Sequence, residues 1–207
     1  RKSDELLPQF VLKRLTEVTQ GRGIVVTGVG QHQMWAAQHC TFKEPNTFIT
    51  SGGLGTMGFE VPAALGAQVG RPDTVVWSVC GDGGFQMTMC DIATAVESGA
   101  DVKFAILNNT NLGMVHQLQD VFFEQDYMAS EFSANPDFVK IAEAYGIRGI
   151  RVTKQEEVVD AVQQAMETAG PVIVDFMVKQ DEIVFPFIPS GQSVKEMLEE
   201  PAHNETS

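Results

Sequence analysis

The chain has 207 residues, about the length of one domain, and 43% of them are hydrophobic, so a sizeable core can form. Its formal net charge of -13 makes nucleic acid and anionic membrane surfaces poor partners, and no apolar run is long enough to cross a membrane. The three cysteines form no C-x-x-C pair, which argues against a disulfide framework and a zinc site and favours a reducing, cytoplasmic location.

Short apolar runs alternate with segments of helical periodicity along the chain. Strands are predicted, in chain order, at residues 24–27, 48–50, 74–80, 103–107, 148–152 and 172–178. Helices are predicted at residues 4–19, from 31 onward, at 59–69, from the glycines at 83–84 to 97, and at 111–124, 137–145 and 155–168.

The alternation predicts an α/β fold with a doubly wound, mostly parallel sheet and helices on both faces. The strands are continuous apolar runs, as expected for strands that are buried on both faces. Residues 1–180 are expected to form this domain. Residues 181–207 are expected to form a C-terminal extension that folds back over the sheet edge as a lid and ends in a disordered stretch at 201–207.

Glycine, aspartate and asparagine residues directly follow four of the predicted strands. The four segments are Gly28-Val29-Gly30, Ser51-Gly52-Gly53, Gly81-Asp82-Gly83 and Asn108-Asn109. The carboxyl ends of parallel strands share one edge of a sheet, and ligands bind beyond that edge. The four loops together therefore predict a ligand site there.

Gly53, Gly55 and Gly58 have the G-x-G-x-x-G spacing of a dinucleotide-binding turn. Such a turn is followed, about twenty residues later, by an acidic residue at the end of the next strand. Asp73 has nearly that spacing, but it precedes the strand predicted at 74–80 and would lie at the wrong edge of the sheet. A dinucleotide site is therefore the weaker interpretation of these glycines.

Asp82 lies among glycines that would let a backbone approach an anion closely. Its charge would repel a bare phosphate, but it could hold a divalent cation that bridges to one. The next loop offers further oxygen ligands for magnesium, namely the side-chain amide of Asn109 and a backbone carbonyl near Asn111. Taken singly, these residues are also ordinary turn residues.

Taken together, Gly81-Asp82-Gly83 and Asn108-Asn109 resemble the GDG…NN motif of thiamine diphosphate (ThDP) enzymes, and the lead-in from Leu65 looks like the longer form of that motif. Four further segments are similar to the catalytic large subunit of the acetolactate synthase (acetohydroxyacid synthase) family. They are residues 30–38 (GQHQMWAAQ), 51–59 (SGGLGTMGF), 108–115 (NNTNLGMV) and 185–191 (FPFIPSG). The resemblance runs from Gly28 to about Leu198 and covers one of the family's three domains, the C-terminal one.

The resemblance implies a set of cofactor and metal contacts. The implied ligands of Mg²⁺ are Asp82, Asn109 and the carbonyl of Asn111, and the implied contacts of the diphosphate are Gln31, His32, Gly83 and Gly84. Taken by itself, His32 could also be a helix-capping or surface histidine.

The resemblance also places the loop at 51–59 beneath the pyrimidine ring. The backbones of Gly55 and Met57 would bond the ring edge, and Met114 is a further expected cofactor contact. The Met57 side chain would bend the cofactor so that its own amino group can act as the base, which makes Met57 the predicted catalytic residue.

Family membership implies that pyruvate is decarboxylated and joined to a second 2-keto acid, giving 2-acetolactate for branched-chain amino acid biosynthesis. It also implies a homodimer or tetramer, a regulatory small subunit, FAD held mainly by a missing middle domain, and a plastid location if the source is a plant or alga. The glutamate that activates the pyrimidine would lie on a missing N-terminal domain of a neighbouring chain, so this chain alone is expected to be inactive.

Leu118 stands where the family's biosynthetic members usually have tryptophan, at a position linked to the choice of acceptor. This residue leaves open another ThDP-dependent 2-keto acid decarboxylase or carboligase. The absence of the pyrimidine-activating glutamate leaves open a non-catalytic ThDP-binding module.

Overall fold

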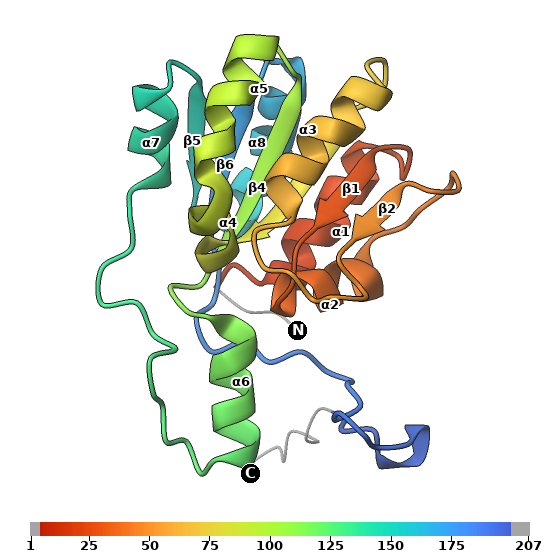
Figure 1. Cartoon of the computed structure of the whole chain (residues 1–207), viewed down its shortest axis with the longest axis vertical. Helices are drawn as coiled ribbons and strands as arrows, with labels where there is room; N and C mark the ends of the chain where they lie inside the picture. Colours follow the sequence, from red (N-terminus) through yellow and green to blue (C-terminus); the bar gives the residue numbers. More distant parts are fainter. Residues whose placement is uncertain (1–4, 200–207) are drawn as a thin grey trace.

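The structure is a computed structural model that describes residues 5–199 (Figure 1). Residue 4, where the first helix is predicted to start, and the predicted disordered end at 201–207 lie outside the described residues. Residues 5–7 are not helical, so the first helix starts later than predicted, at Pro8. Within the described range, no helix is both long and apolar enough to cross a membrane.

Six strands form one parallel sheet. In chain order they are β1 (Ile24–Thr27), β2 (Phe48–Thr50), β3 (Val76–Gly81), β4 (Val102–Asn108), β5 (Arg148–Val152) and β6 (Val172–Met177). Their order across the sheet is β2-β1-β3-β4-β6-β5, and every neighbouring pair is parallel. The predicted fold class is confirmed. The chain order reverses between β1 and β3, and open α/β sheets bind ligands at such a reversal.

Helices cover both faces of the sheet (Figure 1). On one face lie α1 (Pro8–Val18), α2 (Gln31–His39) and α8 (Val158–Glu167), and on the other lie α3 (Glu60–Gly70), α4 (Asp82–Thr88), α5 (Ile92–Ser98) and α7 (Phe138–Ala144). The remaining α-helix, α6 (Gly113–Phe122), follows β4 and projects away from the sheet (Figure 1). Short 3₁₀ turns occur at η1 (Met89–Asp91), η2 (Gln155–Glu157) and η3 (Val194–Glu196).

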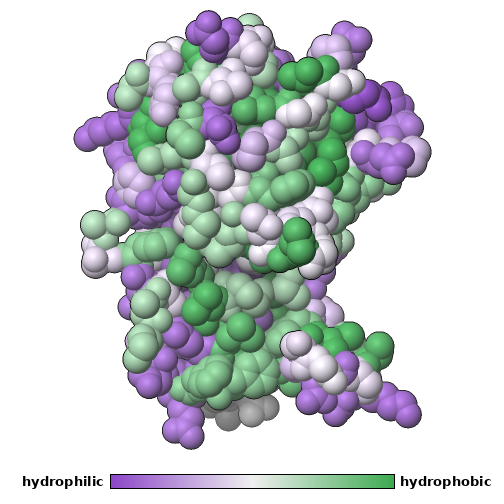
Figure 2. Space-filling view, in the orientation of Figure 1, coloured by the Kyte–Doolittle hydropathy of each residue, from purple (hydrophilic) through white to green (hydrophobic). Residues whose placement is uncertain are grey.

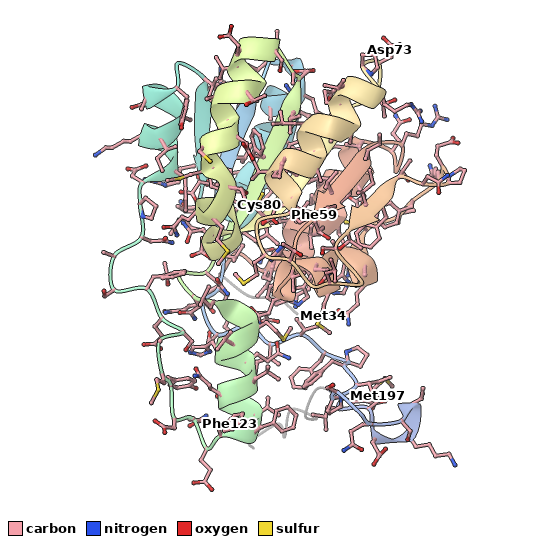
Figure 3. The ribbon with its side chains drawn as sticks, in the orientation of Figure 1. Met34, Phe59, Asp73, Cys80, Phe123 and Met197 are labelled. Carbon is pink, nitrogen blue, oxygen red and sulfur yellow. The ribbon has the colours of Figure 1, made fainter. Side chains whose placement is uncertain are left out.

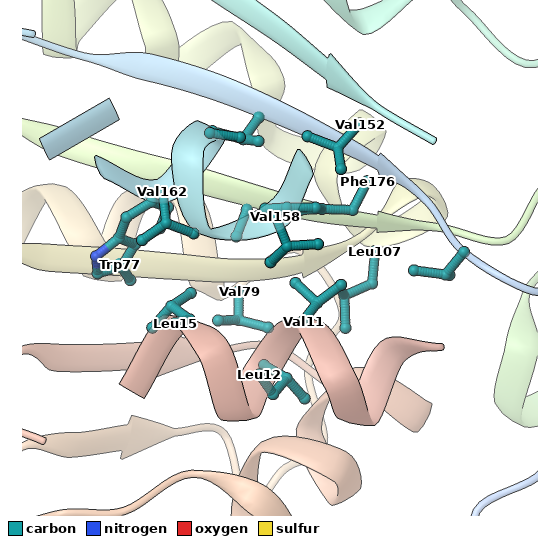
Figure 4. Packing of buried hydrophobic residues seen from close by; sticks show 14 of the residues in the cluster. Val11, Leu12, Leu15, Trp77, Val79, Leu107, Val152, Val158, Val162 and Phe176 are labelled. Carbon is teal, nitrogen blue, oxygen red and sulfur yellow. The ribbon is translucent and has the colours of Figure 1, made fainter. Parts of the chain in front are cut away.

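Each face of the sheet has its own hydrophobic core. Successive side chains of a strand point to opposite faces, so Val25 and Val26 of β1 enter different cores. Figure 4 shows the core on the α1 and α8 side, where Trp77 of β3 and Leu15 of α1 lie close to Val162 of α8. Burial on both faces explains why β1, β3, β4 and β6 are mostly apolar. The edge strand β5 (RGIRV) departs from the predicted pattern, because it carries two exposed arginines.

The structure corrects the single helix that the sequence predicts from residues 83–84 to 97. The segment is divided into α4, η1 and α5. Thr88, at the break, has a φ of -134°, outside the helical range, and its hydroxyl donates a hydrogen bond of 2.7 Å to the carbonyl of Gly58. This contact with a distant loop holds the break in place. The helix predicted at 111–124 is shorter than expected and spans Gly113–Phe122. The one predicted at 155–168 opens with η2, so its α-helical part is Val158–Glu167.

The C-terminal extension runs along α2 and α6. The Gln31 side chain donates a hydrogen bond of 2.8 Å to the carbonyl of Glu182, and the Val184 N–H donates one of 2.9 Å to Gln117 Oε1 on α6. Further along, the Gln38 side chain donates to the carbonyl of Pro186 at 2.8 Å. The extension is thus fixed to both ends of α2 and to the middle of α6. Its movement as a lid stays a prediction.

Candidate functional site

A pocket opens at the carboxyl edge of the sheet, at the ends of β1, β3 and β4. All ten residues that the sequence assigns to the site line this pocket: Gln31, His32, Gly55, Met57, Asp82, Gly83, Gly84, Asn109, Asn111 and Met114. The loops converge as predicted, while the role of each residue stays a prediction. No lysine or arginine is among the residues of 5–199 that line the pocket.

Asp82 begins α4 directly after β3, and its side chain is fully buried. Its Oδ2 accepts a hydrogen bond of 2.7 Å from Asn135 Nδ2, whereas Oδ1 has no hydrogen-bond partner. Burial raises the pKa of this carboxyl group to about 6, against the hydrogen bond from Asn135, which lowers it. A buried carboxylate oxygen without a partner is what a bound divalent cation would satisfy.

A metal at this position would depend on amide and carbonyl oxygens as well. Within residues 5–199, no group of three or more His, Cys, Asp and Glu side chains is arranged to hold a metal ion. Asn109 and Asn111 lie in the same pocket as Asp82, and the Asn109 Oδ1 accepts a weak bond of 3.3 Å from the Asn111 N–H. A carbonyl oxygen has two lone pairs, so Asn109 keeps one for a cation. The ligand set fits magnesium, which prefers oxygen ligands.

Asn135 is a residue that the sequence does not single out. It lies on the segment between α6 and α7, and its Nδ2 also donates to Asn108 Oδ1 at 2.9 Å. Its own Oδ1 accepts from Gln86 Nε2 at 3.0 Å. Asn135 therefore joins the ends of β3 and β4 and fixes the orientation of the Asp82 carboxyl group. Only the folded chain brings residue 135 next to residue 82, so no local pattern could reveal it.

The side chain of Gln31 is already engaged within the protein. Its Nε2 donates to Gln117 Oε1 at 2.9 Å and to the Glu182 carbonyl at 2.8 Å, and its Oε1 accepts from Asn109 Nδ2 at 3.2 Å. An amide nitrogen has two hydrogens, and both are used. A contact between Gln31 and a diphosphate would therefore come from its backbone N–H.

Gly83 and Gly84 have a packing role in addition to the predicted diphosphate contact. A Cβ on Gly83 would lie 2.7 Å from Leu112 Cδ2, and one on Gly84 would lie 2.5 Å from Glu60 Oε1. A side chain at either position would therefore require Leu112 or Glu60 to move. Gly55 differs, because a Cβ there would meet nothing within 4 Å, but its φ of +67° favours glycine.

Glu60 is a second residue that the sequence does not single out. It is the first residue of α3 and the only charged residue in that helix, and its side chain is fully buried. Neither of its carboxyl oxygens has a hydrogen-bond partner. Oε1 lies 4.0 Å from Nε2 of His32, which is also buried and without a partner. The sequence did contain one signal that points to Glu60, because it is a lone acidic residue in an otherwise uncharged helix after a glycine-rich loop.

Burial shifts the ionisation of both groups away from the charged form. It raises the pKa of Glu60 to about 7 and lowers the pKa of His32 to about 4. At neutral pH the imidazole is therefore uncharged in the ligand-free pocket, and Glu60 holds a proton for much of the time. If His32 contacts a diphosphate as predicted, the contact would be made by a neutral ring unless a partner supplies a proton.

The position of Asp73 argues against a dinucleotide site. Asp73 lies between α3 and β3, at the opposite end of the sheet from Met34 of α2, which is near the pocket (Figure 3). It cannot reach a ligand bound at the carboxyl edge. The loop that contains Gly53, Gly55 and Gly58 instead contributes Gly55 and Met57 to the pocket.

Residues 28–176 match the protein family described as "Thiamine pyrophosphate enzyme, C-terminal TPP binding domain". The chain belongs to this family. Thiamine pyrophosphate is the same compound as ThDP, and the matched residues include all ten residues of the predicted site.

The chain is similar to acetolactate synthases. It is 47% identical over 197 residues to the mitochondrial acetolactate synthase catalytic subunit of Saccharomyces cerevisiae, covering 94% of the chain and 28% of that protein. It is 48% identical over 195 residues to the acetolactate synthase large subunit of Corynebacterium glutamicum, covering 92% of the chain and 31% of that protein. It is 43% identical over 204 residues to the chloroplastic acetolactate synthase 1 of Nicotiana tabacum, covering 95% and 31%. The chain thus spans less than a third of the length of these relatives.

Proposed function

We propose that this chain forms the diphosphate- and Mg²⁺-binding part of an acetolactate synthase active site. The whole enzyme would decarboxylate pyruvate and join the remaining two-carbon unit to a second 2-keto acid, giving 2-acetolactate. The proposal is supported by the identity of 43–48% to proteins of that name over more than nine tenths of the chain.

The observation that carries the proposal is the Asp82 carboxyl group in a pocket without lysine or arginine. A diphosphate brings negative charge into a chain whose net charge is already -13. Mg²⁺ held by Asp82 Oδ1, the Asn109 side chain and the Asn111 carbonyl would balance that charge. The same ion would give the unpartnered Oδ1 its missing contact.

Other pocket residues would bind and orient the cofactor. The N–H groups of Gly83 and Gly84 at the start of α4 would donate to the diphosphate, together with His32 and the backbone of Gln31. When bound, ThDP would stabilise the negative charge that forms on the keto carbon of pyruvate as carbon dioxide leaves.

The 51–59 loop would serve the pyrimidine ring. The backbone of Gly55 and Met57 would meet the ring edge, and the Met57 side chain would hold the cofactor bent so that its amino group can remove a proton. Met114, which also lines the pocket, would be a further contact.

The rest of the enzyme would come from segments and chains that are not present here. Apolar side chains stay exposed on and just after α6, among them Leu118, Phe122 and Phe123, and Figure 2 shows apolar surface on this part of the molecule. Such a surface fits contact with another domain or subunit. A homodimer or tetramer, a regulatory small subunit, a domain that holds FAD, and the location of the enzyme in cytoplasm or plastid belong to the proposal.

A different ThDP-dependent carboligase is the second candidate. Leu118 lies on α6, about one turn beyond Met114, and is exposed, so it could contribute to the acceptor site. Only a product assay separates the two candidates. Pyruvate and 2-ketobutyrate would be supplied to the chain combined with the rest of the enzyme, and formation of acetolactate or acetohydroxybutyrate is the expected result.

Cofactor binding can be tested on the 207-residue chain itself by isothermal titration calorimetry. ThDP is expected to bind in the presence of Mg²⁺ and to bind far more weakly in the presence of EDTA. Asp82→Asn should lose the magnesium dependence and retain the circular-dichroism spectrum of the fold. Tight binding of ThDP without any divalent cation would refute the proposal, and so would turnover by this chain alone.

A further inference from the structure

Glu60 lies directly behind the lining of the pocket. A Cβ on Gly28 would be only 1.8 Å from Glu60 Oε2, and one on Gly84 only 2.5 Å from Oε1. The end of β1 and the start of α4 thus leave just enough room for this carboxyl group. Buried carboxyl groups are normally paired or hydrogen-bonded. Neither oxygen of Glu60 has a hydrogen-bond partner, and Oε1 lies 4.0 Å from the imidazole of His32.

His32 lies between Glu60 and the pocket. Its Nε2 is 4.0 Å from Glu60 Oε1 and has no other partner. Its Nδ1 lies against two glycines that line the pocket, since a Cβ on Gly30 or Gly81 would be 2.9 or 3.0 Å from it. One ring nitrogen therefore faces the buried acid, and the other lies on the pocket side.

A bound diphosphate would meet few positive groups from this chain. The described lining residues include no lysine or arginine, so His32 is the one side chain among them that can become a cation. Hydrogen bonds from charged donors to phosphate are roughly twice as strong as those from neutral donors. Burial alone works against a charged imidazole, so the charge needs a partner inside the protein.

We propose that Glu60 is the charge partner of His32, so that the imidazole carries a proton when a diphosphate is bound. This inference rests on the proposed function, because the anion is the diphosphate of the cofactor. In the ligand-free site the proton is on the Glu60 carboxyl group. When the anion binds, that O–H bond breaks and an N–H bond forms at His32 Nε2, leaving a carboxylate beside an imidazolium. The summed charge of the pair does not change, so no net charge enters the core. Glu60 acts through His32 and is a positioning residue.

The surroundings of Glu60 leave His32 as its partner. The ionisable side chain of β3 is the Cys80 thiol, whose pKa burial raises well above its usual value. The ionisable side chain of α4 is Asp82, whose free oxygen is assigned to the metal. On α2, the other ionisable side chain is His39, at the opposite end of the helix from His32. β1 carries no ionisable side chain. The raised pKa of Glu60 and the lowered pKa of His32 agree with a neutral pair in the ligand-free pocket.

The test follows the protonation of His32 by NMR of the ¹⁵N-histidine-labelled 207-residue chain, with Mg²⁺ and inorganic pyrophosphate as the probe. At pH 7, pyrophosphate should convert His32 of the unmutated chain to the doubly protonated ring. In Glu60→Gln the ring should stay neutral, and pyrophosphate should bind about tenfold more weakly by calorimetry. A His32 ring that stays neutral in the bound, unmutated chain would overturn the inference, as would equal affinity of Glu60→Gln.

Two further samples keep the outcome clear. Glu97→Gln removes the same charge from an exposed position of α5 and should bind pyrophosphate like the unmutated chain. Glu60→Ala should weaken pyrophosphate binding as much as Glu60→Gln does. This second variant gives an independent measurement if the chain does not fold with glutamine at position 60. If the unmutated chain binds neither ThDP nor pyrophosphate with Mg²⁺, the proposed function fails together with this inference. If it binds both and His32 does not change, this inference alone fails.

Discussion

Replacing Asn135 by leucine should weaken magnesium-dependent cofactor binding, although Asn135 does not line the pocket. Asn135 Nδ2 donates to Asp82 Oδ2 at 2.7 Å and to Asn108 Oδ1 at 2.9 Å, while Gln86 holds its carbonyl end at 3.0 Å. Leucine has a similar size and shape but no donor. The change therefore removes the one side-chain hydrogen bond to the Asp82 carboxyl group that is present in the described structure and leaves its volume filled.

The magnitude follows from the burial of Asp82. Its side chain is fully buried, so Oδ2 cannot find water in place of the lost donor. A hydrogen bond to a charged group contributes about 1.5–3 kcal/mol, and about 1.4 kcal/mol corresponds to a factor of ten in affinity. The bond favours the ionised carboxylate, so its loss raises the pKa of Asp82 above its value of about 6. We expect Mg²⁺-dependent ThDP binding at pH 7 to weaken by roughly tenfold to a hundredfold.

Calorimetric titration of ThDP in the presence of Mg²⁺, at pH 7 and at pH 8.5, measures this effect. The deficit of Asn135→Leu should shrink at the higher pH, because more of Asp82 is then ionised. Gln163→Leu makes the same chemical change on an exposed part of α8 and should bind like the unmutated chain. If Asn135→Leu binds with unchanged affinity at both pH values, Asn135 does not position Asp82.

Three further outcomes are expected. Asp82 must be ionised to hold Mg²⁺, and its pKa is about 6. The affinity for ThDP in the presence of Mg²⁺, measured by calorimetry, should therefore not change with pH above pH 7 and should fall by about tenfold per pH unit well below pH 6. An affinity that is unchanged at pH 5 would contradict this. Gly113→Ala places a Cβ 2.2 Å from Gln31 Oε1 and 2.7 Å from Asn109 Nδ2, so it should displace both side chains. We expect ThDP binding to weaken at least severalfold and the free energy of unfolding in urea to fall by about 1–3 kcal/mol. Unchanged affinity for ThDP would show that neither side chain needs its present position. Lys103→Met should lower the free energy of unfolding by about 2–4 kcal/mol, because the fully buried ammonium donates to Asp101 and to two backbone carbonyls that would lose their donor. A loss of less than about 1 kcal/mol in urea unfolding would mean that water replaces the ammonium as the donor.

The sequence by itself determined the architecture and the place of the site. The strand around Trp77 is almost entirely apolar, as expected for a strand that is buried on both faces. Since parallel strands end at one edge, the residues that follow them had to meet there, and Asp82 and Asn109 do line one pocket. The argument against a dinucleotide also needed only chain order, because Asp73 precedes its strand.

Only the tertiary structure decided how the site residues are supported. Asn135 reaches Asp82 across 53 positions of sequence, and the break after α4 depends on the bond between Thr88 and Gly58. The use of both Gln31 side-chain hydrogens could not be foreseen, because their acceptors lie on α6 and on the C-terminal extension. Periodicity and motif spacing report what each segment buries and where each strand ends, since both are local properties. Hydrogen bonds between distant segments have no local pattern, so the role of Asn135 became visible only once the chain was folded.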